Sequence, residues 1–194
     1  DSELFFFDPE TEKITSFSTV EGRNPFAKTF TNFIQPSDNG HLWIGTMTGL
    51  YKVNVMDNTV DLYDQARGLS SNNIEALLEI NKEELLIGTN KGFDIYNLKD
   101  STKQNFTKKD GLSSNQTYGV IAGEAPDTYW ISTILGLNFF NARTEAFYNF
   151  FEKDGLSDNE FNRFAQYKDK QGRYYFGGVN GLSSFYEKDL LNAS

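Results

Sequence analysis

The chain has 194 residues, of which 38% are hydrophobic and 15% aromatic, and its formal net charge is −9. This is the composition of a globular protein, with enough residues for one domain or slightly more at about 150 residues per domain. The absence of cysteine excludes disulfides, thiolate nucleophiles and cysteine-ligated metals, and a single histidine, His41, excludes histidine-rich metal sites. The negative charge argues against nucleic acid and anionic membrane surfaces as partners, and no apolar run reaches the roughly 18 residues of a membrane span. We expect no metal and no cofactor.

The first predicted strand begins almost at once, in the apolar run Leu4-Phe5-Phe6-Phe7. No signal peptide precedes it. We therefore interpret the chain as one that starts inside a longer protein.

Three short strings recur along the rest of the chain. GLSSN stands at 68–72 and 111–115, and GLSDN stands at 155–159. Related strings follow at a nearly constant distance, as LWIGT at 42–46, LLIGT at 85–89, YWIST at 129–133 and YYFGG at 174–178. A Gly-Leu or Gly-Phe pair closes each copy, at Gly49, Gly92, Gly136 and Gly181. Because the three markers keep the same spacing of about 44 residues, the sequence contains a structural repeat.

Each copy predicts four short strands. In the copy that is easiest to follow, they cover residues 74–80, 85–89, 93–97 and 104–106, with polar turns between them. Four strands in about 44 residues are typical of a β-propeller blade. The second strand is almost continuously apolar, so we expect it to lie in the middle of the blade, covered on both faces. The glycine of its Gly-Thr pair is expected to let adjacent backbones approach closely.

The predicted fold class is therefore all-β, a partial propeller of about four blades plus a fragment of a preceding blade, in a single segment 1–194. The fragment is placed at the N-terminus because residues 4–12 align with residues 137–145. The last copy is expected to stop after its third strand, near Phe185-Tyr186. The predicted boundaries are 1–17 for the fragment, about 18–60, 61–103, 104–147 and 148–187 for the repeats, and 188–194 for a polar tail.

Two copies depart from the pattern. The first has residues 25–29 where the others have GLSxN, and its loop at 21–24 is longer or different. The third has Glu124-Ala125-Pro126-Asp127 in place of a turn glycine and Ser132 in place of the strand glycine. These departures predict irregular loops in an unchanged fold.

The repeat resembles the two-component regulator propeller repeat. That repeat is found in the periplasmic sensor region of hybrid two-component system histidine kinases of Bacteroides-type bacteria. In that family two propellers precede a β-sandwich, a membrane span, a kinase and a response regulator, and the sensors respond to glycans. Phe161-Asn162 and the string at 175–182 look like that family's final repeat. The resemblance therefore implies the C-terminal part of a second propeller in the periplasm, and it carries over no kinase or DNA-binding activity.

Propellers commonly bind ligands on the face of their loops and in their central channel. The candidate ligand-binding residues are those most free to vary there, namely Asn90, Lys91, Gln116, Asn162, Arg163 and Asn180. Tyr118, which begins an inner strand, is added because its ring offers a stacking face. Amides, a cation and an aromatic ring suit sugar hydroxyls and acidic sugars. A solvated polar rim is the competing interpretation for each of them. The GLSxN loops themselves are expected to be structural, with the glycine at positive φ and the asparagine bonded to nearby backbone.

No catalytic residue is predicted. Trp43 and Trp130 are interpreted as blade core, and His41 as a turn residue without the nucleophile elbow that a triad would need. Most acids fall in turns, and strand alternation places Glu75 opposite its apolar neighbours, so no pair of carboxylates converges. Asp38-Asn39-Gly40 is too short for a calcium loop, and no phosphate-binding loop is present.

Three functions remain open from the sequence. The first is a non-catalytic sensor propeller of a signalling receptor, with an oligosaccharide ligand. The second is a secreted propeller enzyme of the lyase or glycosidase type, and the third is a purely structural or dimerisation propeller. A partial propeller exposes the apolar faces of its end blades, so we also expect self-association, with two copies together completing a ring of about eight blades.

Overall fold

The computed structural model describes residues 3–192, so the ends of the predicted N-terminal fragment (1–2) and tail (193–194) lie outside the described residues. The chain divides into two compact units after Ile74. We describe each unit by itself.

Unit 1 holds a two-stranded hairpin and one four-stranded sheet. The hairpin pairs β1 (Phe5–Asp8) with β2 (Lys13–Ser16), so the predicted third strand of a preceding blade is followed by one more strand. In the sheet, each strand pairs antiparallel with the next. Its strands are β3 (Thr31–Pro36), β4 (His41–Thr46), β5 (Leu50–Asn54) and β6 (Thr59–Tyr63).

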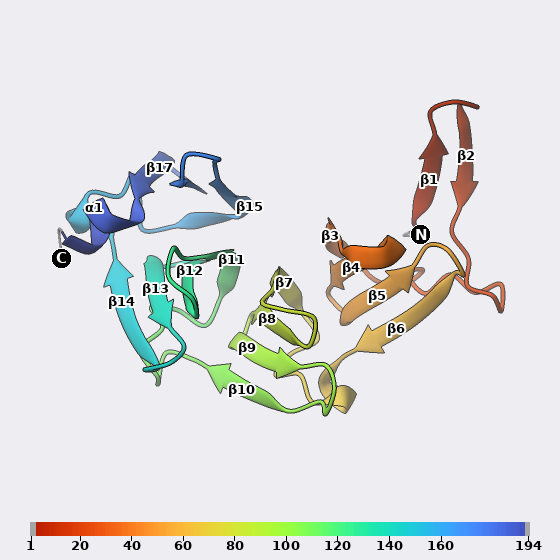
Figure 1. Cartoon of the computed structure of the whole chain (residues 1–194), viewed down its shortest axis with the longest axis horizontal. Helices are drawn as coiled ribbons and strands as arrows, with labels where there is room; N and C mark the ends of the chain where they lie inside the picture. The colour runs from red at the N-terminus through yellow and green to blue at the C-terminus, as the bar shows by residue number, and fades with distance from the viewer. Residues whose placement is uncertain (1–2, 193–194) are drawn as a thin grey trace. The chain divides into compact units, whose positions relative to one another are not determined.

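Unit 2 holds three successive antiparallel sheets (Figure 1). The first contains β7 (Ile74–Glu79), β8 (Glu84–Thr89), β9 (Gly92–Asn97) and β10 (Lys103–Phe106). The second contains β11 (Thr117–Ala122), β12 (Thr128–Thr133), β13 (Leu137–Asn141) and β14 (Ala146–Phe150). The third contains only β15 (Phe161–Lys168), β16 (Arg173–Gly178) and β17 (Gly181–Tyr186), which confirms that the last copy ends after its third strand.

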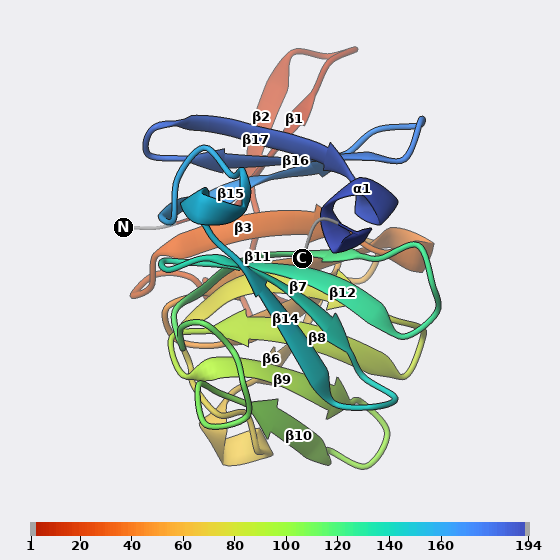
Figure 2. The same cartoon turned by 90° about the vertical axis from the view of Figure 1, so that its left-hand side faces the viewer.

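These sheets confirm the predicted all-β propeller of four blades plus a two-strand fragment. Residues after the last strand, predicted only as a polar tail, instead form the helix α1 (Glu187–Asn192). The helix is held in place because Glu187 and Leu190 are buried against the rest of unit 2, with 6% and 8% of their surface exposed. Figure 2 shows α1 at one end of the strands of the last blade. Short 3-10 turns lie at Asp38–Gly40, Gln65–Arg67 and Glu152–Asp154.

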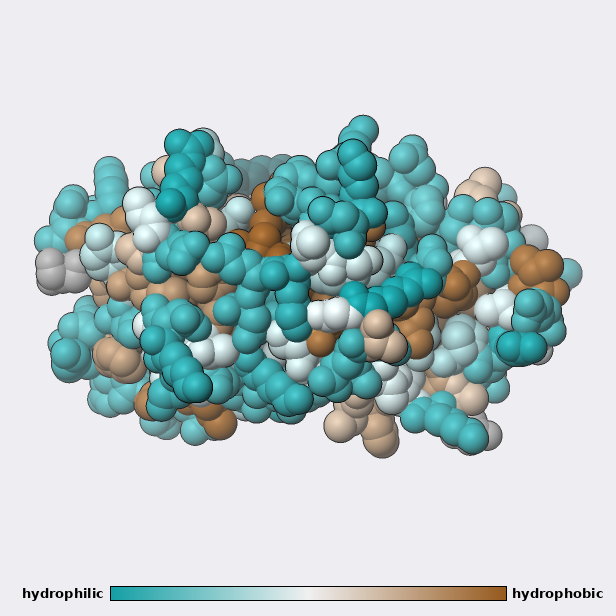
Figure 3. Space-filling model, turned by 90° about the horizontal axis from the view of Figure 1, so that it is seen from below, coloured by the Kyte–Doolittle hydropathy of each residue, from teal (hydrophilic) through white to brown (hydrophobic). Residues whose placement is uncertain are grey.

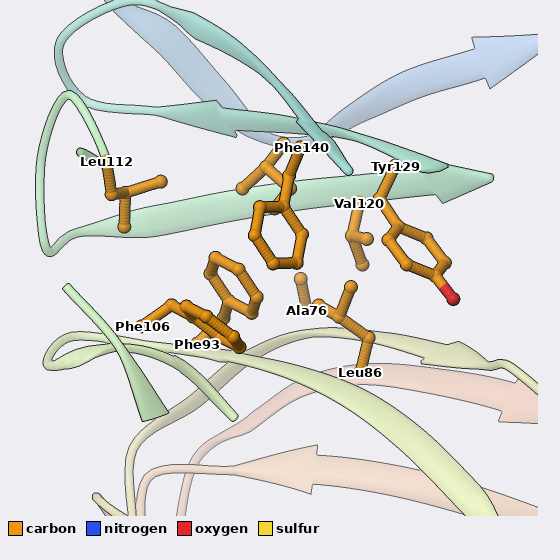
Figure 4. Packing of buried hydrophobic residues seen from close by; sticks show 9 residues of the cluster. Ala76, Leu86, Phe93, Phe106, Leu112, Val120, Tyr129 and Phe140 are labelled. Atoms are coloured by element: carbon orange, nitrogen blue, oxygen red, sulfur yellow. The ribbon is translucent and has the colours of Figure 1, made fainter. Parts of the chain in front are cut away.

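The core of unit 2 lies between neighbouring sheets. Every residue of β12 is buried, as predicted for the second strand of a blade. Between the first two sheets, Phe140 packs against Phe93 and Phe106 with ring centroids 5.2 and 4.7 Å apart (Figure 4). Both tryptophans are fully buried, which confirms their assignment to blade cores.

The strand glycines make room for side chains rather than for adjacent backbones, so the predicted reason for them was wrong. A Cβ at Gly88 would meet Thr117 and Ala76 side-chain atoms at 2.8 and 2.9 Å. In the third copy, where Ser132 replaces the strand glycine of β12, the paired strand β11 has a glycine instead. Gly119 lies opposite Ser132, and a Cβ at Gly119 would meet the Ser132 hydroxyl at 2.8 Å.

The GLSxN loops have the predicted structural role. Gly68, Gly111 and Gly155 have φ of 97°, 118° and 98°. The asparagine side chain of each loop accepts a 2.8 Å hydrogen bond from the backbone N–H seven residues earlier, at Asn72, Asn115 and Asn159. The loops also hold the tight turns, since the carbonyls of Asn115 and Asn159 accept from the N–H of Gly92 and Gly136.

Candidate functional site

The first strand of each blade in unit 2 contributes one polar side chain to a common cluster. Glu75 comes from β7, Tyr118 from β11 and Arg163 from β15, and Gln116 stands just before β11. We call these four residues the arginine cluster. Three of the sequence-predicted ligand residues, Gln116, Tyr118 and Arg163, therefore lie together.

Irregular pairing at the strand starts presents two of these side chains. The register of β11 on β12 shifts between Thr117 and Gly119, so Tyr118 is the extra residue of a bulge. The register of β15 on β16 shifts between Phe161 and Gln166, a stretch that contains Arg163. A bulge redirects a side chain from the alternation of a regular strand, and such irregularities are frequent beside functional sites.

The guanidinium of Arg163 links the cluster. Its Nε lies 2.8 Å from Oε2 of Glu75, and its Cζ lies 4.9 Å from the centre of the Tyr118 ring. The amide of Gln116 donates to Oε1 of Glu75 over 3.2 Å. The ion pair with Glu75 and the ring of Tyr118 restrain the guanidinium.

The two charges of this pair differ in exposure. The side chain of Glu75 is 2% exposed and that of Arg163 is 49% exposed. A guanidinium has five N–H donors in a planar fork, and Arg163 approaches Glu75 through Nε. The arrangement can therefore present a pre-oriented cation and an aromatic ring to an anionic ligand, and the buried carboxylate holds that cation in place.

The other predicted ligand residues do not join the cluster. Asn162 donates to the carbonyl of Gly178 over 3.1 Å. Asn90 and Lys91 are exposed in the β8–β9 turn, and Asn180 is exposed in the β16–β17 turn, where its N–H donates to Asp158. These side chains remain candidates for ligand binding.

The sequence missed Glu75. Alternation does place it opposite Ile74 and Ala76, but the first strand of an inner blade is covered on both faces, so that position is buried as well. One signal in the sequence could have identified Glu75. It is a carboxylate at a repeat position that is buried, and a buried charge requires a partner.

A second buried carboxylate, Glu187, is structural. It accepts from Nε1 of Trp130 at 2.8 Å, from the Tyr174 hydroxyl at 3.3 Å and from the Glu124 N–H. Burial, followed by the charge of Glu187, raises the pKa of Tyr174 far above its usual value, so its hydroxyl stays protonated. These bonds fasten α1 to the last two blades.

The remaining sequence candidates give no further centre in the described part of the chain. His41 begins β4, and its Nδ1 lies 3.0 Å from the Asp38 carbonyl. No group of three or more His, Cys, Asp or Glu residues between residues 3 and 192 is placed to hold a metal ion. Within the same range, no helix has the length and apolar character needed to cross a bilayer.

No family model matches the sequence, and no curated protein matches it. Among solved structures, the chain is similar to the extracellular domain of a protein assigned as hybrid two-component system BT3049 of B. thetaiotaomicron, at 20% identity and a TM-score of 0.62. This match covers 98% of the chain and 34% of that domain.

Two more structures have the same fold. The extracellular domain assigned to hybrid two-component system BT4673 of B. thetaiotaomicron is 19% identical, with a TM-score of 0.65 over 84% of this chain and 21% of that one. PorZ, a surface component of the type IX secretion system of Porphyromonas gingivalis, is 14% identical, with a TM-score of 0.66 over 93% of this chain and 28% of that one. The chain thus spans about a third of these structures or less, and at these identities the similarity establishes the propeller fold alone.

Proposed function

We propose that the chain is a ligand-recognition propeller of an extracytoplasmic sensor in a two-component system, and that it binds an acidic oligosaccharide at the arginine cluster. The observation that carries the proposal is the half-exposed guanidinium of Arg163, held between the buried carboxylate of Glu75 and the ring of Tyr118. The likeness to two extracellular sensor domains supports the sensor role and a periplasmic location. The cluster is a binding site without chemistry of its own.

The chemistry of the cluster favours a uronic-acid sugar over a neutral one. A guanidinium binds a carboxylate with paired, charge-assisted hydrogen bonds. Tyr118 is partly exposed and offers a ring beside that contact, against which the apolar face of a sugar can pack. Because Glu75 and Tyr118 already restrain Arg163, little side-chain entropy is lost when the ligand binds.

The competing interpretation is that the ion pair only fastens three blades together. A double substitution distinguishes a ligand-binding role of the ion pair from a purely structural one. Arg163→Ala alone would leave the buried Glu75 without its cation, so we pair Arg163→Gln with Glu75→Gln, which removes both charges and retains amide hydrogen bonding. Lys188→Gln changes the charge by one unit on an exposed helix residue and is the control.

We expect trigalacturonate to bind the unsubstituted chain and to bind the double variant at least about tenfold more weakly, because charge-assisted hydrogen bonds contribute about 1.5–3 kcal/mol. Isothermal titration calorimetry measures both affinities, with circular dichroism melting as the check on folding. Unchanged affinity in a folded double variant would favour the purely structural interpretation.

We also propose that the chain by itself associates with copies of itself. In unit 1, the outward face of the β1–β2 hairpin exposes Phe5, Phe7 and Ile14 to 55%, 62% and 68%. Brown hydrophobic patches interrupt the mostly hydrophilic surface in Figure 3. In a propeller, an apolar sheet face of this kind is normally covered by the neighbouring blade.

Sedimentation velocity at tens of micromolar is expected to give a species larger than the monomer. Phe7 and Ile14 are cross-strand partners, so replacing both with threonine keeps the strand propensity while removing apolar surface. This double variant should shift the distribution towards monomer. A clean monomer before any substitution would refute self-association.

A further inference from the structure

The turn between β11 and β12, which departs from the other copies, lines a groove in unit 2. Two adjoining hollows of about 400 and 210 Å³ share Ile80, Asp127 and Tyr129. The larger is bounded by the turn at 123–127 and the smaller by Glu84, Ile95 and Arg143. The larger hollow has the size of a small-ligand site. None of these residues belongs to the arginine cluster.

The side chain of Tyr129 lines both hollows of this groove. Tyr129 is only 4% exposed, and its ring stacks on Phe140 at 6.5 Å. Figure 4 shows its oxygen pointing away from the packed rings. Among the residues that the structure describes, this oxygen is not one of the fully buried side-chain atoms that lack a hydrogen bond, so it faces the open groove. The oxygen is therefore accessible to a ligand in the groove.

The groove is acidic around an apolar floor. Glu84 and Asp127 lie beside Tyr129, and Glu79 and Glu124 line the larger hollow. Burial first, and then the charges of Asp127 and Glu84, raise the pKa of Tyr129, so the hydroxyl remains neutral. Arg143 is the cation of the lining, and its Nε lies 2.6 Å from Asp127. The Glu84 carboxylate accepts from the neutral amide of Asn81, so that bond does not compensate its charge.

We propose that this groove binds an aliphatic cation, namely an ammonium or guanidinium group on a short apolar stem such as a lysine or arginine side chain. The head group would donate to Glu84 and to the Tyr129 hydroxyl oxygen. The stem would pack on Ile80, Ile95 and Pro126. Four carboxylates against one arginine in the lining favour a cation over a neutral or anionic group.

The test uses two probes with the same head group. Cadaverine represents a free amine, and the peptide acetyl-Gly-Leu-Lys-Leu-Gly-amide represents a polypeptide source. The same peptide with norleucine in place of lysine keeps the stem and removes the charge. Binding is followed by chemical-shift changes of the amides around Tyr129 in the ¹⁵N-labelled chain, which report the location as well as the affinity.

We expect at least one lysine-like probe to bind in the millimolar range or tighter, and the norleucine peptide to bind at least about tenfold more weakly. Tyr129→Phe keeps the ring on Phe140 and removes only the hydroxyl. It should weaken binding about three- to tenfold, and Glu84→Gln should do the same. Glu152→Gln, which removes an exposed carboxylate outside the groove, should change nothing.

Binding by cadaverine would indicate a small amine as the source, and binding by the lysine peptide alone would indicate a polypeptide. Both outcomes support the cation site. It is overturned if neither probe binds, if the norleucine peptide binds as tightly as the lysine peptide, or if Tyr129→Phe and Glu84→Gln leave affinity unchanged. The outcome is independent of the arginine cluster, which trigalacturonate tests.

Discussion

Replacing Gly92 with alanine is expected to lower the free energy of unfolding by about 2–5 kcal/mol. The positive φ of 96° costs a side chain about 1–2 kcal/mol, and overpacking adds about 1–3 kcal/mol. The overpacking arises because a Cβ at Gly92 would overlap the carbonyl oxygen of Phe106, an atom of the neighbouring backbone that cannot move aside cheaply. Urea denaturation followed by circular dichroism measures the change.

Gly155 provides the matched control. Its φ of 98° is almost the same, but a Cβ there would have nothing within 4 Å. Gly155→Ala should therefore cost only the conformational part, about 1–2 kcal/mol. Equal losses for the two substitutions would contradict the steric reason given for Gly92.

Truncating Trp130 to alanine should cost about 3–5 kcal/mol, as for other large core aromatics. The indole is fully buried, and its ring lies 4.9 Å from Phe185, 5.0 Å from Phe139 and 5.6 Å from Phe150. Because these rings belong to the last two blades, the substitution would remove part of the packing between those two blades. Chemical denaturation followed by circular dichroism would measure the loss.

Trp130→Phe measures how much of this loss of stability comes from the indole hydrogen bond. It keeps much of the ring contact and removes the 2.8 Å hydrogen bond to Glu187, so a loss of about 1–3 kcal/mol is expected. The carboxylate would still accept from Tyr174 and from the Glu124 N–H. A loss below 1 kcal/mol for Trp130→Ala would rule out a core role for this residue.

The blades were predictable because residues with the same structural role recur in several copies of the repeat. The glycine and asparagine of GLSxN recur at 68–72, 111–115 and 155–159, and the structure gives them the same dihedral region and the same hydrogen bond each time. A requirement that recurs at a fixed period is readable from one sequence. The strand glycines were located in the same way, but their neighbours were not, because Thr117 opposite Gly88 belongs to the next blade.

The binding features were predictable only in part because they occur once. Gln116 and Arg163 were chosen as variable polar residues on the loop face and Tyr118 as a stacking ring, and the structure brings them together. Their partner Glu75 is separated from Arg163 by two blade periods in the sequence. The register shifts that direct Tyr118 and Arg163 have no recognisable pattern in the sequence of the strands. The groove at Tyr129 arises from an irregular turn whose sequence predicted only an irregularity.

The most direct test of ligand recognition observes the Nε–H resonance of Arg163 during titration with trigalacturonate. We predict a saturable shift of this resonance, no shift of the Arg143 Nε–H, and no response to the methyl ester of the same trisaccharide, which lacks the charge. An Arg163 signal unmoved at about 10 mM trigalacturonate, or moved equally by the ester, would contradict recognition of an acidic sugar at the arginine cluster.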